Sequence, residues 1–158
     1  MDLMHVGAVW LHTVAFVIAW GYYGILARII LPGLGGTLDL AGQARAVGAI
    51  ERKALPFVLL AVLLFVLTGI YLLVIDPLYD GLGSFGNTWA TLMLIKHMLV
   101  GGLLGLGMLI DYLIRGAADA QRDEDRASDL RWVRLAADGA TALGALVALT
   151  TAAAQFAA

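Results

Sequence analysis

Four long blocks without formal charge dominate the sequence and limit the folds open to it. They are Met4–Ala27, Ala54–Ile75, Thr88–Ile110, which only Lys96 interrupts, and Gly139–Ala158. Each block has about 20 residues or more, the length that a helix needs to cross a bilayer core of roughly 30 Å. We therefore predict an all-α integral membrane protein. The chain is expected to be one domain, 1–158, with membrane spans at about 4–31, 54–75, 88–114 and 133–156.

Composition supports this class. Hydrophobic residues make up 61% of the 158 residues and charged residues 14%, whereas soluble domains carry about a quarter charged residues. Four spans leave almost no chain for a soluble domain. The net charge of −2 argues against nucleic-acid binding, and the absence of cysteine excludes disulfides and thiolate metal sites.

The basic residues predict the orientation of the chain. They cluster around the first link, at Arg28, Arg45, Arg52 and Lys53, and around the third link, from Arg115 to Arg134. By the positive-inside rule both links face the cytoplasm, so both termini lie on the outer face. We expect an up-down four-helix bundle in the cell (inner) membrane.

The links also contain turn signals. Pro32 and the glycines after it predict the end of the first span, and residues 37–53 form a short interfacial turn or helix. Pro56 lies near the expected start of the second span, where a missing N–H is tolerated. The polar stretch 117–129 predicts a solvated cytoplasmic loop.

Two histidines occur at similar depth in the first and third spans. His12 lies about eight residues into the first span and His97 about nine into the third, so both are roughly 12–14 Å below the outer surface. These spans are diagonal in an up-down bundle, and two inward imidazoles could face one another across a flat metal macrocycle. We predict bis-histidine ligation of heme b, with packing histidines as the alternative. Gly69 falls near this layer and would permit close approach of a ring.

Lys96 precedes His97 and points about 100° away from it around the helix. It either snorkels toward the headgroups or pairs with an anionic cofactor or substrate group. Arg28, near the cytoplasmic end of the first span, is expected to anchor that end. We expect Asp111 to pair with Arg115, and Asp138 with Arg28 or Arg134.

Copper is the alternative cofactor. His5, His12, Met93 and His97 are borderline or soft ligands near the same face, and Met93 and His97 are spaced i,i+4. A third possibility is a non-catalytic accessory subunit of a larger membrane complex. Its support is the last span, whose small residues suit close contact with neighbouring or partner helices. Membrane lipids, a redox partner and a second copy of the chain are the expected partners.

Three of the four spans resemble a known family. The stretches "WLHTVAFVIAWGYYGILARIILP", "LPFVLLAVLLFVLTGIYLLV" and "WATLMLIKHMLVGGLLGLGM" are similar to the CopD-like and HemJ-like small four-helix membrane proteins. The likeness lies in a His and a Trp followed by an Arg in the first span, a Thr-Gly in the second and a Lys in the third.

The resemblance implies two functions. HemJ-like members are heme-b-binding protoporphyrinogen oxidases, and the resemblance carries their important residues to His12, Arg28 and Lys96. CopD-like members are associated with copper import or resistance. The HemJ-like resemblance implies an oxidoreductase that acts on a lipophilic substrate such as a porphyrinogen or quinol, or a simple electron carrier.

Overall fold

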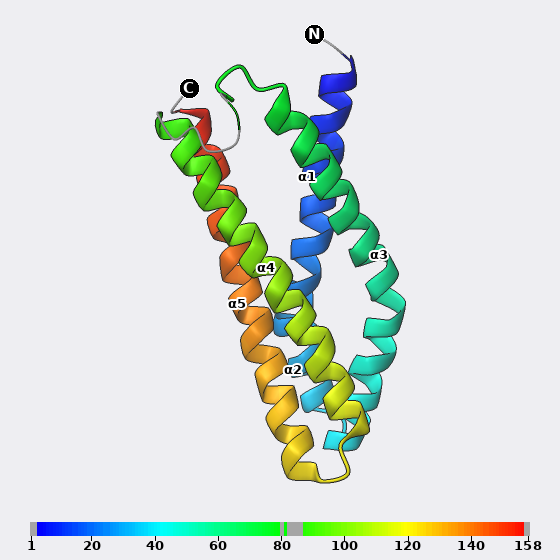
Figure 1. The fold of residues 1–158 in the computed structure, drawn as a ribbon. Coiled ribbons are helices and arrows are strands. Elements are labelled where there is room, and N and C mark those ends of the chain that lie inside the picture. The colour runs from blue at the N-terminus through cyan, green and yellow to red at the C-terminus, as the bar shows by residue number, and fades with distance from the viewer. Residues whose placement is uncertain (1–2, 80, 82–86, 157–158) are drawn as a thin grey trace.

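The computed structural model describes residues 3–79, 81 and 87–156 as a bundle of four long helical rods (Figure 1). The first rod consists of α1 (Leu3–Ile25), the π-helical η1 (Leu26–Ile30) and α2 (Leu31–Gly35). The other three are α3 (Leu40–Val74), α4 (Thr88–Asp119) and α5 (Asp123–Gln155). All four are long and apolar enough to cross a membrane, which confirms the all-α four-helix class of a multi-pass membrane protein.

The rods run up and down, so both ends of the chain lie at one end of the bundle (Figure 1). The most extensive contacts join α4 to α5 and α1 to α3, and α1 also packs on α5 and α3 on α4. The helix α1 is therefore diagonal to α4, as the sequence predicts.

The helices extend beyond the predicted spans toward the basic end. Residues 40–53 form the first part of α3, continuous with the second span, because Asp39 caps this helix by accepting a 2.8 Å hydrogen bond from the Gly42 N–H. Pro56 consequently lies inside α3 and not near its start. In Figure 1 α3 curves through its middle, as expected for a helix with an internal proline.

Two other expectations about the links can be compared with the structure. The first rod continues through Pro32, which lies in the first turn of α2, and ends at Gly35, so the glycines after Pro32 end the helix as predicted. The polar stretch 117–129 is almost wholly helical, with only Ala120–Arg122 between α4 and α5. Arg126 closes this short link by donating to the carbonyl oxygens of Ala117 and Ala120.

The main hydrophobic core lies in the half of the bundle near the basic links. All four rods contribute to it, through Leu26, Val47, Ile110 and Val133 among others, each no more than 1% exposed. On α5 the buried residues Val133, Ala137, Ala140, Gly144 and Val147 follow the spacing of one helix face. Toward the end with the chain termini, the α1–α3 pair diverges from the α4–α5 pair (Figure 1).

Candidate functional site

His12 occupies a niche on α3 in the half of the bundle that contains the termini. Its ring stacks on Phe65, with centroids 4.2 Å apart. Its Nδ1 lies 3.0 Å from the Phe65 carbonyl oxygen and 3.0 Å from Thr68 Oγ1. A Cβ atom added to Gly69 would come within 3.0 Å of His12 Cε1. The glycine therefore makes room for the imidazole itself.

The hydrogen bonds define the tautomer of His12. A carbonyl oxygen can only accept, so Nδ1 carries the proton and donates it to Phe65. The Thr68 hydroxyl donates to the Leu64 carbonyl at 2.6 Å, which leaves its oxygen free to accept from Nδ1 as well. Nε2 then holds a lone pair, and no described residue hydrogen-bonds to it. A histidine fixed through Nδ1–H to a carbonyl is the usual form of a metal-ligating imidazole.

His97 does not face His12. It starts at the same level, nine residues into α4 as His12 is nine into α1, but its side chain is exposed on the outside of the bundle. Its Nδ1 lies 2.6 Å from the carbonyl oxygen of Met93, one turn earlier in the same helix. The two imidazoles are thus matched in depth but not brought together.

Lys96, one residue before His97 on α4, is half-buried, whereas His97 is exposed. The 100° between adjacent helical residues explains this difference in exposure.

Arg28 lies in η1, near the basic end. Its Nε is 2.9 Å from Asp138 Oδ1 on α5, which confirms one of the two predicted partners of Asp138. The predicted pair on α4 is also present, with Arg115 Nη2 2.9 Å from Asp111 Oδ2. Single-turn π-helices occur frequently at functional sites, so the position of Arg28 inside one is notable. About 16 residues separate it from His12, roughly 24 Å along the helix axis.

The candidate copper ligands do not converge. His5 and His97 are exposed, Met93 is half-buried, and His12 faces α3. Within the described ranges no group of three or more His, Cys, Asp or Glu side chains could hold a metal ion.

Glu51 was missed by the sequence analysis. At 6% exposure it is the buried charged residue of the described chain, and it accepts a hydrogen bond from the Tyr22 hydroxyl. The signal was available, because Ala44, Val47 and Glu51 lie on one helical face once α3 is extended backward. The assumption that residues 37–53 formed a separate interfacial segment concealed it.

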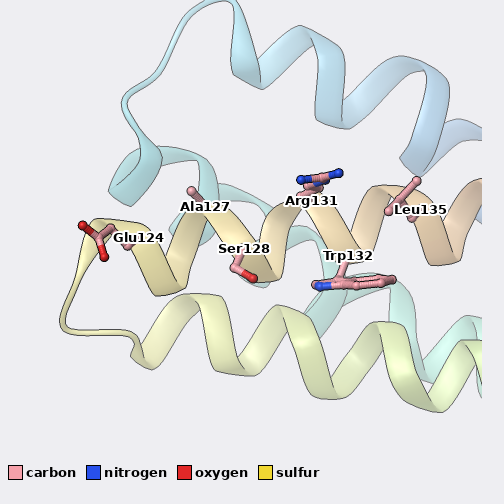
Figure 2. Close-up of a pocket in the computed structure, with 6 residues that line it drawn as sticks. All are labelled: Glu124, Ala127, Ser128, Arg131, Trp132 and Leu135. Carbon is pink, nitrogen blue, oxygen red and sulfur yellow. The ribbon is translucent and has the colours of Figure 1, made fainter.

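A shallow hollow lies on the outer surface of α5, near its start (Figure 2). All its lining residues belong to this one helix, and Arg131 and Trp132 point in different directions from it. An exposed Arg and Trp near the basic end of a membrane helix suit contact with lipid headgroups. The hollow lies at the opposite end of the bundle from His12.

Comparison with known proteins gives no match for this chain among family models, curated proteins or solved structures.

Proposed function

We propose that this protein is a heme-b-binding protein of the cell (inner) membrane in which His12 is an axial ligand through Nε2. The observation that carries the proposal is the fixed imidazole of His12, with Nδ1–H held by the Phe65 carbonyl and Nε2 without a hydrogen-bond partner in the described chain. The resemblance to HemJ-like proteins points to the same histidine. A bound heme b would supply single-electron transfer, or oxidation of a lipophilic substrate such as a porphyrinogen or quinol.

The surroundings of His12 fit such a group in several respects. Phe65 and Thr68 orient the ring, so the His12 side chain loses little further conformational freedom when it binds a metal. The main hydrophobic cluster lies in the other half of the bundle from His12.

Lys96 contributes a positive charge at a half-buried position of α4. We assign it to the carboxylate of a heme propionate or of an anionic substrate group, because an ammonium in the hydrocarbon layer is stable only with a partner or access to water. Arg28 is too far along the helix to reach the same group and serves the basic end of the bundle.

The bis-histidine form of the proposal makes a further demand on α4. His97 would have to leave the Met93 carbonyl and turn around the helix toward the bundle interior. We therefore assign the ligand role first to His12, and to His97 only after that rotation.

The test is a reduced-minus-oxidised absorbance spectrum of protein purified from heme-replete cells. We expect sharp α and Soret bands that His12→Ala abolishes or shifts. Lys96→Met should weaken retention of heme, while His97→Ala should leave the bands in place unless α4 turns. A featureless wild-type spectrum, with no stoichiometric iron, would refute the proposal.

A further inference from the structure

Glu51 is a buried carboxyl group that forms no ion pair with the described residues. It follows Val47 and Gly48 by one turn, and a Cβ on Gly48 would touch Ile114 and Ala118 of α4. Glu51 therefore lies on the face of α3 that packs against α4, while Arg52 and Lys53 next to it are exposed. The ion pairs of the described residues join other groups, and none includes Glu51.

The partner of Glu51 is a neutral hydroxyl from another helix. Tyr22 of α1 donates to Glu51 Oε2 across 29 residues of sequence. The neighbouring Tyr23 is also buried, and its hydroxyl lies against the α4 backbone at Gly107, where a Cβ atom would overlap it. Tyr22 therefore contacts the carboxyl from α1, while Tyr23 next to it packs on α4.

The titratable groups of α4 on this side of α3 are Asp111 and Arg115, which form an ion pair with each other. From α1 the titratable neighbours of Glu51 are the neutral Tyr22 and Tyr23. Helices α5 and α2 also pack on α3, and no titratable group of their described residues acts on Glu51. The negative charge of an ionised Glu51 is therefore left unbalanced, which is costly away from water.

We propose that Glu51 is a proton-binding site at the basic end of the bundle, with Tyr22 as the hydrogen-bond donor that holds the carboxyl in place. The proton binds to Oε1, because Oε2 accepts from Tyr22, and the reaction is the simple gain or loss of H⁺ by the carboxylate. The adjacent Asp111–Arg115 pair, of which Arg115 is exposed, gives the route to water at this end. The inference does not depend on heme.

The experiment is infrared difference spectroscopy of the purified full chain in lipid, over a pH titration and after exchange into D₂O. We expect a C=O stretch of a neutral carboxyl group at neutral pH, shifted by D₂O and lost in Glu51→Gln. Tyr22→Phe should keep the band and move its frequency, because the hydrogen bond to the carboxyl is removed. Glu124→Gln, at an exposed position of α5, is the matched control and should leave the neutral-pH band in place.

Either of two results would overturn the proposal. One is the absence of any such band at neutral pH in folded wild-type protein, and the other is an unchanged band in folded Glu51→Gln. The helical circular dichroism of each variant shows that it is folded. If Glu51→Gln does not fold, the proposal is tested with Tyr22→Phe. An unchanged C=O frequency in that variant would assign the band to another carboxyl group and refute the proposal. Heme content is read separately from the Soret band, so loss of the heme proposal leaves this result intact.

Discussion

At the scale of single residues, the environment of His12 depends on one missing methyl group. Gly69 is close enough to the imidazole that any Cβ there must displace the ring, which is held by Phe65 and Thr68. Gly101 on α4 offers the contrast, because nothing lies within 4 Å of its added Cβ. Space for a side chain is therefore limited at Gly69 and open at Gly101.

We predict that Gly69→Ala destabilises the protein by about 1–3 kcal/mol, the usual cost of overpacking. In the heme-loaded protein it should also weaken or shift the Soret band, since His12 would be displaced. Thermal unfolding in detergent and heme content measure the two effects. Gly101→Ala is the control and should be neutral or slightly stabilising, because alanine favours helix. Equal behaviour of the two variants would show that the imidazole is not seated against Gly69.

The ion pair between Arg28 and Asp138 is a second prediction at this scale. The Arg28 side chain is 71% exposed and that of Asp138 33%. Exposed pairs contribute roughly 0.2–1 kcal/mol, so a double-mutant cycle with Arg28→Ala and Asp138→Ala should give a coupling energy below about 1 kcal/mol. A loss of activity much larger than this stability change would assign Arg28 a role beyond anchoring. A coupling well above that value would mean the pair is shielded from water in the membrane.

At the scale of helices, α1 and α5 are joined by an indole placed over a glycine. Trp20 Nε1 donates to the Thr141 carbonyl at 2.9 Å, and a Cβ at Gly144 would overlap the indole ring. The small residues of α5 therefore serve, at least along this face, contacts within the bundle. Interfaces of this kind are typical of membrane helices, where close backbone approach replaces the hydrophobic driving force.

Gly144→Ala should accordingly force Trp20 out of its position and break its hydrogen bond. We expect a loss of about 2–4 kcal/mol, from overpacking and the lost buried bond together. The change should also appear in the tryptophan fluorescence of a variant that keeps Trp20 as its only tryptophan. Gly105→Ala, on α4 with open space around it, is the control. A fluorescence spectrum unaltered by Gly144→Ala would contradict the packing described.

At the scale of the whole molecule, the four rods are longer than a bilayer core requires. Rods of 32 to 35 residues extend roughly 48–52 Å, so each projects beyond a core of roughly 30 Å. The extra turns carry most of the basic residues. The orientation predicted from them places the α4–α5 link in the cytoplasm and the 75–87 link outside.

The absence of cysteine makes this orientation directly measurable. Two single-cysteine variants test it: Ser128→Cys, at an exposed position of α5, and Tyr79→Cys, in the link at the opposite end of the bundle. In intact cells a membrane-impermeant maleimide should label Tyr79→Cys and spare Ser128→Cys, which should react only after the membrane is opened. The reverse pattern would invert the predicted topology, and the bundle itself would be unaffected.

The sequence alone determined the helical class and the four helices of membrane-spanning length, because hydrophobic length depends only on composition and position. It also predicted the Arg28–Asp138 and Asp111–Arg115 pairs, since charged groups near a membrane boundary have few possible partners. Only the tertiary structure decided the rotation of each helix. That rotation leaves Lys96 half-buried and His97 exposed. It follows from packing against neighbouring helices, which the sequence of one helix does not show. The same packing buries Glu51 against Tyr22, because α3 begins fourteen residues before the apolar block. A search for uncharged blocks alone does not find this residue.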